Sequence, residues 1–230
     1  MRFEDLNWMD IETYLKTDDR LMLIIGACEQ HGYLSVTTDV KIPLALADAV
    51  SQRTGVIVAP TINYGCSPYF QSYPGTISLR INTLLNLLED VISSIYQSGF
   101  RRVLVLNGHG GNSSVRTFLY EMANRYPEMK FGWYEWWKSP AVEGISRKYD
   151  LKPTHANWLE AFSFTIVSNL PEKPKPEIEE SAIVHKDEIK NLYGDGSFGG
   201  YYIASVPIMD EMFNACVDEI LDLLNFTTTL

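Results

Sequence analysis

Two short motifs place histidines directly after buried apolar runs. Glu29-Gln30-His31-Gly32 follows the run at 21–27, and Asn107-Gly108-His109-Gly110-Gly111-Asn112 follows the run at 103–106. His31 and His109 are half of the four histidines in the chain. Glu29 stands two residues before His31, a spacing that puts both side chains on the same side of an extended chain. Imidazoles with a carboxylate beside them are typical of a metal site.

A second carboxylate, Asp39, follows His31 by eight residues and stands just before an expected helix. A loop of that length can fold back, so we expect Asp39 to join Glu29, His31 and His109 at one site. Two imidazoles and two carboxylates suit zinc, manganese or iron. Taken singly, each residue has another reading, as a helix cap or as a hydrogen-bonded histidine. Their joint placement after two buried strands favours the metal site.

A third motif, His155-Ala156-Asn157-Trp158-Leu159-Glu160, supplies one more histidine and one more carboxylate. Asn157 is expected to cap a helix that runs through Ile166, with Glu160 in its first turn. A carboxylate near a helix N-terminus is also stabilised by the helix dipole, so capping is an alternative role for Glu160. His185 stands in no such motif, and we expect it to be structural.

Alternating strands and helices are expected to position these motifs. Four apolar runs are typical of short buried strands, at 21–27, 56–60, 103–106 and 131–136. Helical spacing of apolar residues predicts helices at 43–53, 82–98, 113–126 and 205–225. This alternation predicts an α/β fold with a mostly parallel sheet covered on both faces, in which ligands bind at the carboxyl ends of the strands. The proline-rich, charged segment 171–180 is expected to be a surface connection, and the glycine-rich loop at 193–200 lacks the following helix of a phosphate site.

The composition indicates one globular domain over residues 1–230, with 46% hydrophobic and 21% charged residues. A formal net charge of −10 argues against nucleic acid or an anionic membrane as a partner. No apolar stretch approaches the ~20 residues that cross a bilayer, and the N-terminus shows no signal-peptide pattern. The three widely spaced cysteines predict reduced thiols, and we expect the protein to be cytoplasmic.

The residues of these motifs resemble those of the creatininase (creatinine amidohydrolase) family, over nearly the whole chain. The resemblance rests on both histidine motifs, on Thr38-Asp39, on Ser67 with Pro74-Gly75-Thr76-Ile77-Ser78-Leu79, and on His155-Ala156 with Glu160. It implies a three-layer α/β/α sandwich around a mostly parallel sheet. It also implies two divalent metal ions per chain, bridged by an aspartate, and assembly as a homohexamer.

The same resemblance implies a role for each matched metal ligand. One ion would be held by Glu29, Asp39 and His109, and the other by His31 and Asp39. In creatininase a further carboxylate, two residues after the histidine of the second motif, completes the second set. Gly111 occupies that position here, so we assign the missing ligand to Glu160.

Catalytic and substrate-binding roles are also implied by the resemblance. His155 matches the catalytic histidine of the family, which would shuttle a proton near the leaving nitrogen. Glu160 is the second residue assigned to the catalytic centre. Backbone N–H groups around Gly110 and Gly111 would stabilise an oxyanion. Trp136 and Trp137 are candidates for the wall of the substrate pocket, with core packing as the alternative.

The sequence therefore predicts a metal-dependent amidohydrolase that cleaves an amide-type C–N bond in a small or cyclic substrate. Phe70 stands where many relatives carry a histidine, and together with Gly111 it argues against creatinine itself as the substrate. Two alternatives stay open: a metal hydrolase acting on a formamide, a peptide or a cyclic ketone, and a non-catalytic metal-binding protein. The expected partners are a small-molecule substrate and further copies of the chain.

Overall fold

A parallel sheet forms the centre of the molecule. The computed structural model describes residues 1–178 and 182–227, and its sheet has the strand order β2-β1-β3-β4. The strands are β1 (Arg20–Ile25), β2 (Ile57–Val58), β3 (Arg102–Asn107) and β4 (Lys130–Glu135). Each lies on one of the predicted apolar runs, and each pairing in the sheet is parallel. Ile25 is in register with Asn107, so the two histidine motifs leave the sheet at the same level.

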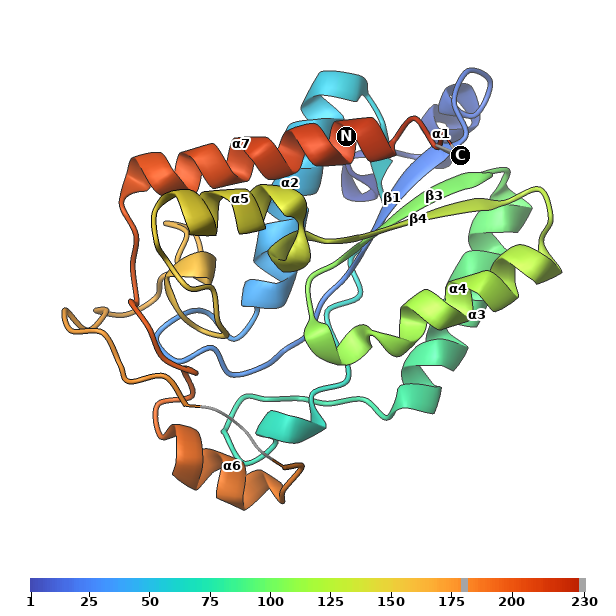
Figure 1. The fold of residues 1–230 in the computed structure, drawn as a ribbon. Helices are drawn as coiled ribbons and strands as arrows, with labels where there is room; N and C mark the ends of the chain where they lie inside the picture. The colour runs from blue at the N-terminus through green and yellow to red at the C-terminus, as the bar shows by residue number, and fades with distance from the viewer. Residues whose placement is uncertain (179–181, 228–230) are drawn as a thin grey trace.

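Helices cover both faces of this sheet (Figure 1). One face is covered by α2 (Thr38–Thr54), α5 (Pro140–Lys148) and α7 (Val206–Leu223), and the other by α3 (Ile81–Ser98) and α4 (Ser114–Arg125). Side chains along a strand alternate between the two cores: Met22 packs with the first group of helices, whereas Leu21 and Leu23 pack with the second. The predicted α/β fold, a three-layer α/β/α sandwich, is confirmed.

Three further helices were not predicted from the sequence: α1 (Trp8–Tyr14), α6 (Lys186–Tyr193) and the already named α5. The helices expected at 82–98, 113–126 and 205–225 are present with ends shifted by one or two residues. The described part of the segment expected to be a surface connection, 171–178, is exposed or half-buried, while Glu179 and Glu180 lie outside the described residues. All three cysteines are free thiols. Within the described residues, no helix is both long and apolar enough to cross a membrane.

Two predictions about helices near the site are wrong. The helix expected at 43–53 begins five residues earlier, at Thr38, and Pro43, which was expected at its start, lies inside it. Asp39 therefore lies in the first turn of α2 and not in a loop before it. The helix expected from Asn157 through Ile166 is a single 3-10 turn, Trp158–Glu160. Asn157 does cap that turn, but the Thr165 hydroxyl donates to the Glu160 carbonyl, so the chain turns away after one turn.

Candidate metal centre

The five predicted metal ligands meet at the carboxyl ends of β1 and β3. Two follow β1, one follows β3, one lies in the first turn of α2 and one in the 3-10 turn at 158–160. All five side chains are buried: Glu29, His31, Asp39, His109 and Glu160. Their donor atoms form two groups that share Asp39, one with Glu29 and His109 and the other with His31 and Glu160. Within each group the donor atoms lie within 4.8 Å of one another.

The shared carboxylate of Asp39 lies between the two imidazoles. Its Oδ1 is 3.0 Å from Nε2 of His31, and its Oδ2 is 2.9 Å from Nδ1 of His109. In the described part of the chain, Asp39 Oδ2 and His31 Nε2 are buried without a hydrogen-bond partner. Buried polar atoms are normally satisfied, so these unpaired atoms fit coordination to an ion. A carboxylate whose two oxygens face different histidines has the geometry of a bridging ligand.

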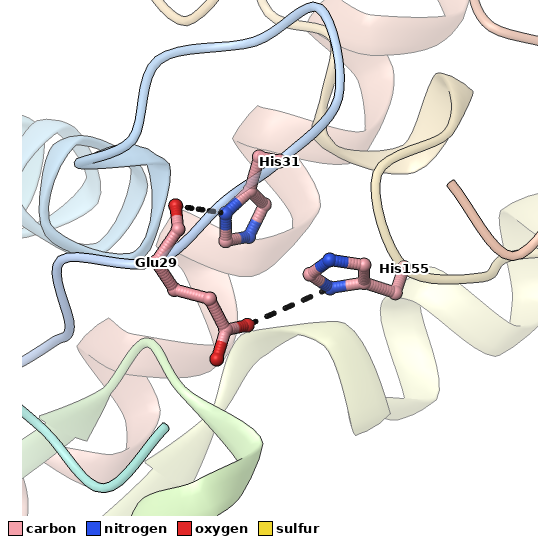
Figure 2. Close-up of side chains that lie close together, drawn as sticks. All are labelled: Glu29, His31 and His155. Carbon is pink, nitrogen blue, oxygen red and sulfur yellow. Dashed lines mark hydrogen bonds and ion pairs between the residues drawn. The ribbon is translucent and has the colours of Figure 1, made fainter. Parts of the chain in front are cut away.

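Backbone carbonyls fix the protonation of both imidazoles. Nδ1 of His31 lies 3.1 Å from the Glu29 carbonyl oxygen (Figure 2), and Nε2 of His109 lies 2.9 Å from the Cys66 carbonyl oxygen. A carbonyl only accepts, so each of these nitrogens carries the proton. In the neutral form that binds a metal, the opposite nitrogens, Nε2 of His31 and Nδ1 of His109, would carry the lone pairs, and both face Asp39. Histidine ligands of metals are held in this way by a second group behind the ring.

The charges of this cluster favour a cation at its centre. Burial raises the pKa of Glu29 to about 7, although the His109 imidazole opposes this. Burial lowers the pKa of His109, but Glu29 and Asp39 outweigh it and raise that pKa to about 9. The pKa of His31 is raised well above its ordinary value because Asp39 and Glu160 outweigh burial. The carboxylates thus stabilise positive charge on both rings, and a divalent cation would supply that charge in place of the protons.

The two carboxylate oxygens of Glu160 contact different groups, one at the candidate metal centre and one on the backbone. Its Oε1 lies 3.6 Å from Nε2 of His31, and its Oε2 accepts a hydrogen bond of 2.7 Å from the N–H of Ala156. Position 111, where the family resemblance implied a carboxylate, is closed here, because a Cβ on Gly111 would overlap with the Cys66 carbonyl oxygen. The local backbone therefore excludes a carboxylate at 111, while Glu160 lies within reach of the second group.

A cavity of about 500 Å³ is lined by four of the five proposed ligands: Glu29, Asp39, His109 and Glu160. His155 lies in its wall, with Nδ1 4.0 Å from Glu29 Oε1 (Figure 2). The His155 ring stacks on Phe70 with centroids 4.7 Å apart, and Phe198 packs at 5.1 Å. Burial, together with the charge of nearby His31, lowers the pKa of His155 to about 4. The wall contains further aromatic and prolyl side chains: Pro68, Tyr69, Trp137 and Pro153.

The predicted substrate-binding residues separate into two groups. Gly110, Gly111 and Trp137 line the cavity. Trp136 does not, because it is buried in the core, where its ring packs edge-on against Phe162. The reason is that β4 ends at Glu135, and the following 3-10 turn directs consecutive side chains to different sides. Trp136 is therefore a core residue, which was the alternative reading of the sequence.

Glycine at 108 is required by the close approach of α2. A Cβ at this position would overlap with the Asp39 carbonyl oxygen and lie 2.9 Å from Pro43 Cγ. We expect Gly108→Ala to lower the free energy of unfolding by about 1–3 kcal/mol, because the first turn of α2 must move. Gly110→Ala is the matched control, since no atom lies within 4 Å of the added Cβ. Denaturant unfolding of both variants tests this, and equal stability would contradict the packing argument.

Fold and site together define a three-layer α/β protein with a candidate metal centre at the carboxyl ends of its strands. The chain belongs to the creatininase family, whose model, described as creatinine amidohydrolase, matches residues 4–224.

Several characterised proteins are similar to parts of the chain. It is 31% identical over 154 residues to creatinine amidohydrolase from Pseudomonas putida, covering 60% of this chain and 59% of that protein. It is 30% identical over 123 residues to 3-dehydro-scyllo-inosose hydrolase from Thermotoga maritima, covering 53% and 40%. It is 32% identical over 120 residues to mycofactocin precursor peptide peptidase from Mycolicibacterium smegmatis, covering 49% and 48%. The matched stretches thus span between 40% and 59% of these relatives.

A solved structure confirms the fold over its whole extent. A crystal structure of creatinine amidohydrolase (creatininase) superposes with a TM-score of 0.81, at 24% identity, over 98% of this chain and 96% of that one.

Proposed function

We propose that this protein is a metal-dependent hydrolase that cleaves an amide-type C–N bond in a small substrate. The observation that carries the proposal is the buried Asp39 carboxylate, whose oxygens face His31 and His109 and which lines a cavity. Two divalent ions would fit this arrangement, one in each donor group. Such ions, when bound, make a strong nucleophile of water near neutral pH and polarise a carbonyl oxygen. Homohexameric assembly stays a prediction of the family resemblance.

The cavity supports an uncharged substrate of modest size. Among the described residues that line it there is no lysine or arginine, so apart from the proposed ions no side-chain cation is present to pair with a carboxylate or phosphate of a substrate. Its aromatic wall, with Phe70 and Trp137, suits an apolar or flat group. His155 would act through Nδ1, the nitrogen that faces Glu29. The backbone around Gly110 lines the same cavity and would contact the reacting carbonyl.

The named relatives differ in substrate, so the reacting bond needs a direct test. Protein loaded with zinc or manganese should be assayed against creatinine, small formamides, short peptides and a cyclic ketone. Hydrolysis of an amide, lost on chelation and restored by metal, would support the proposal. Cleavage of the ketone alone would favour the alternative substrate class. Tight metal binding without turnover of any of these would favour a non-catalytic protein.

Glu160 is proposed as the carboxylate that completes the second donor group. We expect Glu160→Gln to remove about one of two bound ions, because an amide nitrogen is a poor ligand while its oxygen can keep the bond to Ala156. Metal analysis after dialysis measures this. Glu128→Gln, which changes an exposed partner of Arg101, is the matched control. Full metal content in the Glu160 variant would return Glu160 to a purely structural role.

A further inference from the structure

The side-chain amide of Gln30, between two proposed ligands, is held at both ends by the backbone. Its Oε1 accepts a hydrogen bond of 3.0 Å from the N–H of Gly32. Its Nε2 donates to the carbonyl oxygen of Gly196 at 3.1 Å. An N–H only donates and a carbonyl only accepts, so the amide has one orientation. A flipped amide would set its oxygen against the Gly196 carbonyl oxygen and its NH₂ group against the N–H of Gly32.

The second proton of this amide is directed at His155. Gln30 Nε2 lies 3.0 Å from His155 Nε2. Since the amide nitrogen is a donor, His155 Nε2 must accept and carry no proton. The proton of a neutral His155 ring therefore lies on Nδ1, the nitrogen 4.0 Å from Glu29 Oε1 (Figure 2).

The glycine-rich loop at 193–200 is built to support this contact. A Cβ on Gly196 would overlap with Gln30 Oε1, so glycine is required for the amide to lie where it does. The N–H of Phe198 donates to the His155 carbonyl oxygen, and its ring packs on the imidazole. The loop is held in turn by Lys175, whose Nζ donates to Asp195 Oδ1 at 2.5 Å and to the Ser197 carbonyl oxygen at 2.7 Å. This loop thus fixes both the ring and the amide.

We propose that Gln30 is a positioning residue that holds His155 as the Nδ1–H tautomer, so that the ring meets the substrate as a neutral hydrogen-bond donor. A ring in this form stabilises negative charge that develops on the carbonyl oxygen, but it takes up no proton at Nδ1. A proton on Nε2 would point at the amide NH₂ of Gln30. The proton-shuttle role implied by the family resemblance is therefore disfavoured here. The tautomer itself is independent of the proposed function, and only the effect of Nδ1–H on a substrate rests on that function.

The tautomer can be measured without any substrate. Zinc-loaded protein labelled with ¹⁵N at its histidine rings would be studied by magic-angle-spinning NMR, with the His155 signals assigned from their loss in His155→Gln. The wild-type protein should show His155 protonated at Nδ1 and bare at Nε2. Gln30→Leu, which removes the donor, should introduce the Nε2–H form. Gln30→Glu, whose carboxylate accepts, should make that form predominant.

Thr76→Val is the matched control, since it removes the hydrogen bond from the Gln30 main-chain N–H and leaves the side-chain amide intact. Its tautomer should be that of the wild type. Gln30→Leu should keep its metal content and lower kcat at least about 10-fold with little change in KM, because a transition-state contact is lost. An Nε2–H ring in the wild type, or an unchanged ring in Gln30→Leu, would overturn the proposal. Both NMR results can be obtained without substrate, so they test the tautomer whether or not the protein hydrolyses an amide.

Discussion

Asp39→Ala is expected to empty both metal positions and to reduce hydrolysis to background. Asp39 is the residue common to both donor groups, and its two oxygens lie about 3 Å from the ligand nitrogens of His31 and His109. Without it each group keeps only one imidazole and one carboxylate, too few donors for a stable protein site. Affinity for both ions should fall by more than about 100-fold, the upper range for loss of a supporting residue alone.

Two comparison variants make this result specific. His109→Ala should weaken chiefly one ion, because His109 belongs to one donor group only. Asp48→Ala changes another aspartate of α2, which pairs with Arg2 at the surface, and should keep its full metal content. Metal analysis of the three purified variants, with circular dichroism to verify folding, provides the measurement. An Asp39→Ala protein that remains fully loaded would exclude the bridging role.

His155→Ala is expected to lower turnover by about 10²- to 10⁴-fold while metal content is retained. The ring lies in the cavity wall, and its Nδ1 faces the proposed reaction centre. His155 belongs to neither of the two groups that share Asp39, so its loss leaves both intact. The two candidate roles, donor and shuttle, both require the ring, which is why the expected loss is large under either.

His185→Ala is the matched control for this change. His185 lies at the N-terminus of α6, with its side chain largely exposed, and its ring accepts a hydrogen bond from the N–H of Asp187. Turnover and metal content should both remain at the wild-type level in this variant. Loss of metal together with activity in His155→Ala would instead make His155 a metal ligand. The donor atoms of His155, Glu29 and His31 lie close enough together to form a third possible group of ligands.

Much of the fold followed from local patterns in the sequence. The apolar runs at 21–27 and 103–106 predicted β1 and β3, because a strand buried on both faces needs a continuous apolar segment. Helical spacing gave α3, α4 and α7 nearly to the residue, since their buried faces repeat with the helical period. The helix start at Thr38 was missed, because a proline inside a helix reads as a boundary when only neighbouring residues are considered.

The candidate site likewise has features that the sequence predicted and features that it did not. Motif spacing was enough to bring Glu29, His31 and His109 to one end of a parallel sheet, whatever the details of packing. It was not enough to separate Trp136 from Trp137, because the turn that follows β4 decides which indole enters the core.

The sequence by itself predicted the class of chemistry, since imidazoles and carboxylates after buried strands can form a metal site in any fold that aligns those strands. Only the tertiary structure decided how Asp39 divides its oxygens between two rings and which nitrogen of His155 faces the amide of Gln30. The second outcome depends on Gln30 and Gly196, which lie 166 residues apart in the chain. The physical reason is that hydrogen-bond direction is set by atoms meeting in space, and a pattern of residue types carries no information about such distant contacts.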